Sequence, residues 1–210
     1  MLVSGKSSAE KEREMFKLVG ILITSIGICW AAVDPALVKK AEDYLNGIKT
    51  YKARIEQTNT NGTQQKGWFY MQRDGKKRFG KMRIEYDKPV TDLMVVDGRD
   101  FYFFDGQAKE TNTYDIDSTP AAFLLRRKID LHNDLKIIDK AEEGDELGLK
   151  VVRSGDDSGA ALILKFSLKP IFKLNGWAVI DGQGLMTRVH LDNVQIGLDL
   201  DSSLFQYRSK

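Results

Sequence analysis

Histidine is the residue type best suited to acid–base or metal chemistry near neutral pH, and this sequence has two histidines. A metal site would also need carboxylate partners at helical or hairpin spacing. His132 and His190 are far apart in the sequence, and the stretch VHLDN gives His190 only Asp192. This pattern favours an exposed pair on a strand, so we predict neither a metal site nor a cofactor.

Two short motifs resemble phosphate-handling motifs, but neither has the surroundings that this chemistry requires. The stretch SGKSS, residues 4–8, lacks the earlier glycine and the preceding strand of a phosphate-binding loop. The stretch DIDST, residues 115–119, would need to follow a buried parallel strand, and nothing here alternates strand with helix. A turn with a helix cap is the favoured interpretation. Because there is also no G-x-S-x-G motif and no clustered acid pair, we do not expect an enzyme.

The stretch RFGKMRIEYDKP, residues 78–89, mixes basic and apolar residues and raises the question of nucleic-acid binding. The chain has 32 Lys and Arg against 30 Asp and Glu, so its net charge of +2 gives no basic field for a nucleic acid. Apolar residues at 82, 84 and 86 alternate with charged residues at 83, 85 and 87. This period of two predicts a strand with one apolar face.

The remaining sequence predicts the elements that must position these side chains. Residues 34–48 have a capping Asp, a Pro at the first helical position and apolar residues at spacings of three and four, which predict an amphipathic helix. From residue 50 onward, strands recur every 8–12 residues with Gly turns, as in an antiparallel meander. Residues 118–125 interrupt the meander with a short apolar helix. The sequence thus favours a curved sheet or open barrel with helices on its concave side.

Four stretches carry large apolar side chains at consecutive positions, which exceeds what a sheet with one wet face needs. These stretches are GWFYMQ, LMVV, FYFF and LILKF. One explanation is that both faces of the sheet are covered, one by helices and one by a second layer. The other is a hollow apolar cavity, and the sequence leaves both explanations open.

The N-terminal region has the basic, apolar and small-residue order of a secretory signal peptide. Lys11, Arg13 and Lys17 precede the apolar run LVGILITSIGIC, which is shorter than the ~20 residues of a membrane span. We therefore expect residues 1–31 to be cleaved, with Met15 as an alternative start, and residues 32–210 to form a single domain. Cleavage would remove Cys29, the one cysteine, and export without disulfides suggests a bacterial periplasm.

The stretches GWFYMQR, RFGKMRIEYDKP, VVDGRDFYFFD and STPAAFLL fall in an order and spacing that resemble the LolA family, the periplasmic carriers of outer-membrane lipoproteins. The closing stretch from residue 175 to residue 207 also looks like the family. This resemblance implies a mainly β fold, an unclosed antiparallel barrel of ten or eleven strands with a helical lid over an apolar cavity.

The resemblance also implies a function and partners. The chain would shield the acyl chains of lipoproteins and move them from the inner to the outer membrane as a monomer. The expected partners are acylated lipoproteins, an inner-membrane lipoprotein-releasing ABC transporter and, as an open alternative, an outer-membrane acceptor lipoprotein. The rival interpretation is a lipid- or lipoprotein-sensing regulatory domain of the same fold.

In the family, an arginine holds the lid by hydrogen bonds to helix carbonyls. Counting from Gly67 gives Arg73 for this role, and counting back from Tyr86 gives Arg78, because about five residues are inserted between the two counts. We favour Arg73, which shares parity with the inward side chains of its strand. The residues expected to line the lipid cavity are Phe69, Met71, Met82, Ile84, Tyr86, Met94, Val96, Phe101, Phe103, Phe123 and Leu124.

Overall fold

The structure is a computed structural model that describes residues 34–133 and 135–208. The expected signal peptide, residues 1–31, and the alternative start at Met15 lie outside the described residues. Residues 33–210 form one compact unit. Among the described residues, no helix is both long enough and apolar enough to cross a membrane.

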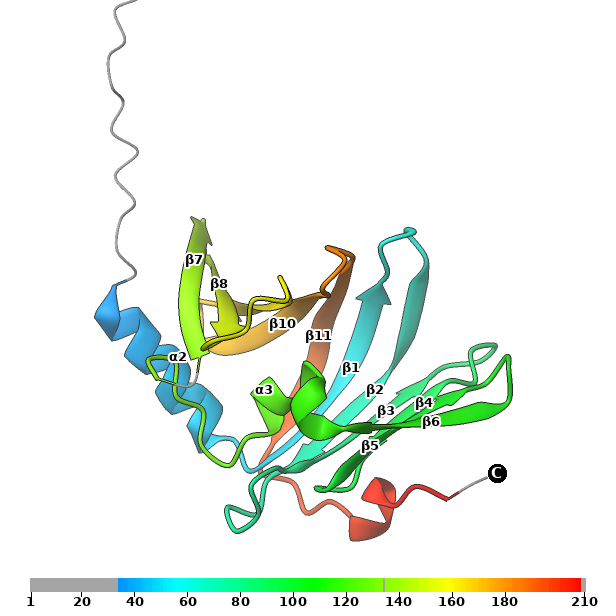
Figure 1. Ribbon diagram of the computed structural model, residues 1–210. Coiled ribbons are helices and arrows are strands. Elements are labelled where there is room, and N and C mark those ends of the chain that lie inside the picture. The colour runs from blue at the N-terminus through cyan, green and yellow to red at the C-terminus, as the bar shows by residue number, and fades with distance from the viewer. Residues whose placement is uncertain (1–33, 134, 209–210) are drawn as a thin grey trace, which may run out of the picture. The chain divides into compact units, whose positions relative to one another are not determined.

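Eleven antiparallel strands form one strongly curved sheet (Figure 1). The order across the sheet is β6-β5-β4-β3-β2-β1-β11-β10-β9-β8-β7, so the first and last strands of the chain, β1 and β11, pair in the middle. The edge strands β6 and β7 do not pair with each other, which leaves the barrel unclosed and confirms the predicted fold. The strands are β1 Thr50–Thr58, β2 Gln64–Gln72, β3 Lys81–Tyr86, β4 Leu93–Val96, β5 Asp100–Asp105, β6 Glu110–Asp115, β7 Leu135–Glu143, β8 Glu146–Arg153, β9 Ala161–Ser167, β10 Lys173–Ile180 and β11 Met186–Ile196.

Alternation along the strands separates a buried concave face from an outer face. In β1, Tyr51, Ala53 and Ile55 are buried, while the residues between them are partly exposed. On the outer face, Trp68 of β2 lies under the ammonium group of Lys52, 4.7 Å from the ring centroid. The Trp68 ring can therefore lie on the solvent-facing side of the sheet, because the Lys52 side chain of the neighbouring strand covers it.

The helix α2, Pro35–Gly47, begins where the sequence predicts. The Asp34 side chain accepts a hydrogen bond from the backbone N–H of Ala36 at 2.9 Å, which caps the helix. One side of the helix is buried through Val38 and Leu45, together with Ala41. Because a helix of this length is marginal alone, this burial stabilises it.

A second helical segment lies on the concave side of the sheet (Figure 1). It consists of η1, Ile116–Ser118, and α3, Ala121–Leu125, and we call residues 116–125 the lid. The Thr119 hydroxyl donates to the carbonyl of Ile116 at 2.8 Å and closes the turn between the two pieces. The DIDST stretch is thus a turn that leads into a helix, as the sequence predicts.

The outer face of β3 is covered by the C-terminal segment, which contains η2, Ser202–Phe205. Phe205 is 1% exposed, and Arg83 of β3 donates from Nη1 to the carbonyl of Leu204 at 3.1 Å. Tyr102 of β5 stacks on Tyr207 with ring centroids 4.9 Å apart. Part of the apolar excess in the sequence is therefore explained by a second covering layer.

Candidate functional site

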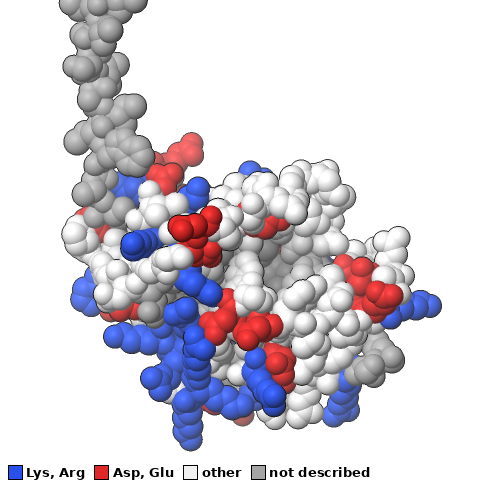
Figure 2. All heavy atoms as spheres, in the orientation of Figure 1, with Lys and Arg blue, Asp and Glu red and all other residues white. Residues whose placement is uncertain are grey.

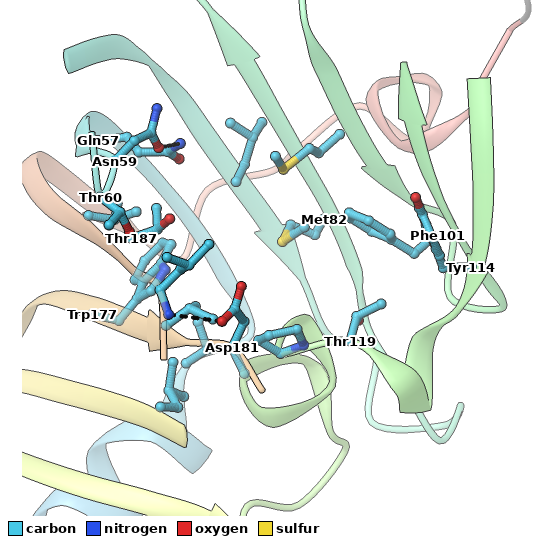
Figure 3. Close-up of a pocket in the computed structure, with 18 of the residues that line it drawn as sticks. Gln57, Asn59, Thr60, Met82, Phe101, Tyr114, Thr119, Trp177, Asp181 and Thr187 are labelled. Carbon is cyan, nitrogen blue, oxygen red and sulfur yellow. Dashed lines mark hydrogen bonds between the residues drawn. The ribbon is translucent and has the colours of Figure 1, made fainter. Parts of the chain in front are cut away.

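The concave side of the sheet holds a cavity of about 920 Å³ (Figure 3). This volume is near the upper end of the roughly 300–1,000 Å³ of small-molecule sites. Its residues come from strands on both sides of the lid and from the lid itself. They are Gln57, Asn59, Thr60, Asn61, Met82, Ile84, Met94, Phe101, Tyr114, Ser118, Thr119, Pro120, Leu124, Leu162, Trp177, Val179, Asp181, Leu185, Thr187 and Val189.

One wall of the cavity is formed by three consecutive strands. Met82 and Ile84 of β3, Met94 of β4 and Phe101 of β5 line it, and Leu124 of the lid is also among the lining residues. The register explains this convergence, because Ile84 is paired with Met94. All five residues are among those that the sequence predicts to line the cavity.

The opposite wall comes from β9, β10 and β11, through Leu162, Trp177, Val179 and Val189. Sequence reasoning missed this wall, since all the lining residues that it named lie between residues 69 and 124. The signal that could have found it is the strand alternation, because Trp177 and Val179 share parity on β10. The two walls belong to the two halves of the sheet. They face one cavity because β1 and β11, which are distant in the sequence, pair and join the halves.

Polar side chains gather on one part of the lining. The hairpin between β1 and β2 supplies Asn59, Thr60 and Asn61, and Thr187 of β11 lies beside them (Figure 3). The Asp181 carboxylate accepts the backbone N–H of Leu185 at 2.9 Å, so it holds its own turn. The cavity thus has apolar walls and a polar rim, and sequence reasoning did not identify the rim.

The other predicted lining residues lie outside this cavity. Phe69 and Met71 of β2 line a separate gap of about 10 Å³ with residues of α2. Val96 is fully buried in the core, and Phe123 is partly buried against it. Phe103 of β5 is partly exposed and lines neither space.

The Tyr86 side chain also points toward the rim rather than into the cavity. Its hydroxyl donates to Oε1 of Gln57 at 2.7 Å, and Gln57 itself lines the cavity. Burial raises the pKa of the Tyr86 hydroxyl well above its usual value, so the group stays protonated at neutral pH. Tyr86 therefore acts on the cavity through Gln57, which it orients.

Arg73 is the one buried charged or polar residue identified among the described residues, with 7% of its surface exposed. Its Nε donates to the Ile48 carbonyl at 3.1 Å, its Nη1 donates to the Arg126 carbonyl at 3.2 Å, and its Nη2 donates to the Leu45 carbonyl. Burial lowers the pKa of Arg73 to about 10, which still leaves the side chain charged at neutral pH. The end of α2 and the residue after α3 are thus joined to β2.

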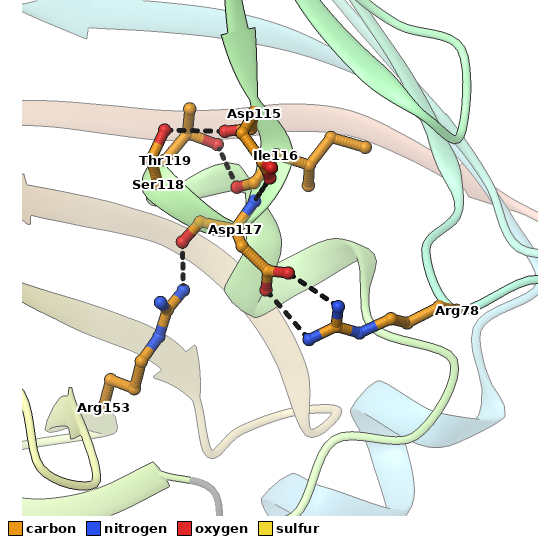
Figure 4. Close-up of polar contacts among 7 residues, drawn as sticks. All are labelled: Arg78, Asp115, Ile116, Asp117, Ser118, Thr119 and Arg153. Carbon is orange, nitrogen blue, oxygen red and sulfur yellow. Dashed lines mark hydrogen bonds and ion pairs between the residues drawn. The ribbon is translucent and has the colours of Figure 1, made fainter.

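Arg78, the second arginine considered, makes a different contact (Figure 4). Its guanidinium forms a two-pronged ion pair with Asp117 of the lid, with Nη1–Oδ2 and Nη2–Oδ1 distances of 2.7 and 3.2 Å. Arg153 of β8 donates to the backbone carbonyl of the same residue, Asp117. Asp117 is therefore held from both sides of the lid, a contact that sequence reasoning did not predict.

The apolar walls set the chemistry of this cavity. In the described part of the chain, no cluster of three or more His, Cys, Asp or Glu could hold a metal ion. His190 and Asp192 form an exposed pair 3.5 Å apart on β11, outside the cavity lining. Apolar walls of this kind bind an apolar ligand by removing its surface from water.

Known proteins with similar sequences share one description. A protein from Methylococcus capsulatus named outer-membrane lipoprotein carrier protein is 27% identical over 192 residues, covering 86% of this chain and 88% of that protein. A protein of the same name from Nitrosomonas europaea is 24% identical over 182 residues, covering 79% of this chain and 86% of that protein.

A solved structure from Vibrio parahaemolyticus, provisionally described as an outer membrane lipoprotein-sorting protein domain, shares the fold. Its TM-score is 0.50 at 12% identity, over 81% of this chain and 94% of that one. The sequence profile described as "Outer membrane lipoprotein carrier protein LolA" matches residues 46–208. This match spans both halves of the sheet, the lid and both walls of the cavity. The chain therefore belongs to the LolA family.

Proposed function

We propose that this protein is a periplasmic carrier that encloses the acyl chains of lipoproteins and moves them from the inner to the outer membrane. The observation that carries this proposal is the cavity of about 920 Å³ between two apolar walls, with Leu124 of the lid among its lining residues. Membership in the LolA family and the names of the relatives support lipoproteins as the cargo.

The energetics of such a carrier need no reactive group. An acyl chain in water costs about 0.8 kcal/mol for each exposed CH₂, so a lipoprotein cannot cross an aqueous space unprotected. The side chains of Met82, Ile84 and Phe101 remove this cost by burial alone. A carrier must also release its cargo, so the lid must be held by contacts that can break. No catalytic step belongs to this proposal.

The proposal includes export and two further partners. The signal peptide expected at residues 1–31 would take the protein to the periplasm, where an inner-membrane ABC transporter would supply lipoprotein. An acceptor lipoprotein in the outer membrane would receive it. N-terminal sequencing of the periplasmic protein tests the export step, with a start near residue 32 as the expected result. Residues 1–20 on the functional protein would contradict it.

The decisive experiment is mass spectrometry of what co-purifies with the protein from the periplasm, followed by a transfer assay. We expect diacylated or triacylated lipoprotein to co-purify and to pass from the complex to an acceptor membrane. Lipid that binds but is never transferred would instead support a lipid-sensing domain. A protein that hydrolyses the lipid, or that carries none, would contradict the carrier function.

A further inference from the structure

Two short segments, residues 76–78 between β2 and β3 and residues 126–128 after α3, carry only basic residues, six in a chain whose net charge is +2. The backbone places these segments side by side. The N–H of Arg127 donates to the carbonyl of Arg78 at 2.9 Å, and an isolated antiparallel bridge joins Phe79 to Arg126. We call the six residues Lys76, Lys77, Arg78, Arg126, Arg127 and Lys128 the basic patch.

Four side chains of the basic patch are exposed and form no ion pair with the described carboxylates. These four are Lys76, Lys77, Arg127 and Lys128. Figure 1 places both segments at the lower left of the molecule, where Figure 2 shows Lys and Arg side chains gathered together. The positive charge of the patch therefore faces solvent.

The acidic residues within these loops serve the backbone rather than the basic side chains. Oδ1 of Asp74 accepts the N–H groups of residues 76 and 77 at 2.9 and 3.1 Å. Asp130 likewise accepts the N–H groups of His132 and Asn133, both at 2.9 Å. The backbone bonds lower the pKa of the Asp74 carboxyl group, and a hydrogen bond from the Asn133 side chain, together with the backbone bonds, lowers that of Asp130. Both loops thus have a fixed shape, and their lysines stay free to bind an external anion.

We propose that the basic patch is a docking site for the surface of an anionic phospholipid bilayer. Clusters of Lys and Arg gain affinity for such a surface from its negative potential, without a shaped pocket. The long side chains of the patch can each reach a separate headgroup phosphate. This inference goes beyond the proposed carrier function, because it assigns a second binding surface that is separate from the cavity.

The composition of the patch favours a bilayer over an acidic protein. Protein interfaces depend on buried aromatic or apolar anchors and are depleted in lysine. The exposed large apolar residues of the described chain lie elsewhere, and the nearby apolar residues Phe79, Leu125 and Ile129 are buried. The patch therefore offers charge without an apolar anchor, which suits headgroups.

The test compares vesicle binding by residues 33–210, the compact unit, with binding by the quadruple variant K76Q/K77Q/R127Q/K128Q. The protein of residues 33–210 is used because it lacks the apolar run of residues 18–29, which would bind membranes by itself. The vesicles contain phosphatidylcholine alone or equal parts phosphatidylcholine and phosphatidylglycerol, and co-sedimentation measures the bound fraction. Arg78 and Arg126 stay unchanged, because Arg78 pairs with Asp117 and the Arg126 carbonyl accepts from Arg73.

We expect the parent protein to bind the anionic vesicles only, and to lose this binding between ~0.1 M and ~1 M salt. Each basic side chain near an anionic surface contributes about fivefold in affinity, so the variant should bind about a hundredfold or more weakly. The matched control is K136Q/K165Q/K173Q/R188Q, which makes the same four substitutions at exposed positions on β7, β9, β10 and β11. The control should lose no more than about tenfold.

Three results would overturn the proposal. The parent could bind both kinds of vesicle equally, or the control could lose as much affinity as the patch variant. Soluble polyglutamate could also bind the patch as tightly as the vesicles do, which would indicate an acidic protein partner. Circular dichroism checks that each variant folds, and the pairs K76Q/K77Q and R127Q/K128Q replace the quadruple variant if it does not. Binding of a lipopeptide to the cavity is measured separately. A failure of the proposed carrier function can therefore be distinguished from a failure of the vesicle-docking proposal.

Discussion

Nη1 of Arg73 lies 3.2 Å from the carbonyl oxygen of Arg126, so one buried guanidinium joins the residue after β2 to the residue that follows the lid. The same side chain donates to Leu45 and Ile48 at the end of α2. The position of α3 relative to α2 is thus set by a side chain that belongs to neither helix. The lid cannot leave the sheet without breaking a charge-assisted hydrogen bond.

Replacing Arg73 with Leu should loosen the lid and change cargo release without unfolding the protein. Three carbonyl groups lose their hydrogen bond from the Arg73 guanidinium, and we expect the free energy of unfolding to fall by about 2–4 kcal/mol. Typical domains have about 5–15 kcal/mol, so the fold should persist. Release of a fluorescent diacyl lipopeptide and urea unfolding measure the two effects.

Arg73→Lys is the matched control, because it keeps the charge but cannot reach three carbonyls with a rigid fork. Its release rate should lie between those of the parent and Arg73→Leu. Normal release and normal transfer by both variants would show that Arg73 does not hold the lid in function.

Asp117→Asn should weaken the lid far less than Arg73→Leu does. Asp117 forms an ion pair with Arg78, whose side chain is 72% exposed, and exposed ion pairs contribute only about 0.2–1 kcal/mol to stability. We therefore expect lipopeptide release to increase by no more than about fivefold. The difference should shrink in ~1 M salt, where exposed charges are screened. An effect larger than that of Arg73→Leu would mean that Asp117 is the main holding point.

Met82→Glu should impair lipopeptide binding while the protein stays folded. Met82 is 5% exposed and lines the apolar wall, so a carboxylate there is costly to bury beside an acyl chain. Met82→Leu keeps the apolar wall and should bind normally. Equilibrium binding of the lipopeptide, with melting temperature beside it, measures both variants. If Met82→Glu binds as well as the parent does, Met82 does not contact the cargo.

Tyr51 should make the protein sensitive to alkaline pH. Burial raises its pKa above the ordinary value of 10, so the folded protein keeps a proton that the unfolded chain releases. Its contribution to stability is complete below pH 10 and falls above it, by up to about 1.4 kcal/mol per pH unit. The lowered pKa of Arg73 changes the free energy of unfolding in the opposite direction over this pH range. Because Arg73 is present both in the parent and in a Tyr51→Phe variant, its effect cancels when the two are compared.

Urea unfolding of the parent and of Tyr51→Phe at pH 9, 10 and 11 tests this prediction. The parent should lose more stability between pH 10 and 11 than the variant does. The Tyr51 hydroxyl donates a long hydrogen bond, 3.4 Å to the Leu174 carbonyl, and its loss should leave the variant folded. Equal slopes for the two proteins would contradict the role of Tyr51.

Local signals made much of the fold predictable from the sequence. Alternation predicted the buried side of β3, and the capping Asp34 predicted the start of α2. Gly turns predicted the hairpins, and in the first hairpin Gly62 has a φ of +80° that favours glycine. Each of these signals acts over a few residues, and for that reason a single sequence contains it.

The cavity was only partly predictable, because parity gives the face of a strand but not the position along it. Phe69 and Met82 both point to the concave side, yet Phe69 lies under α2 while Met82 lines the cavity. Which end of the sheet a helix covers depends on contacts between distant residues. The same reason hid Trp177 and the contact between Arg153 and the lid.

The missing pair between β6 and β7 bears on how much cargo the protein can hold. In a closed barrel, the number of strands and their stagger fix the circumference, so a larger load would have to break the ladder. In this protein the two edge strands can spread while every existing hydrogen bond between strands stays formed. A carrier of the kind proposed above would therefore have an elastic capacity, and it could accept lipoproteins with two or with three acyl chains.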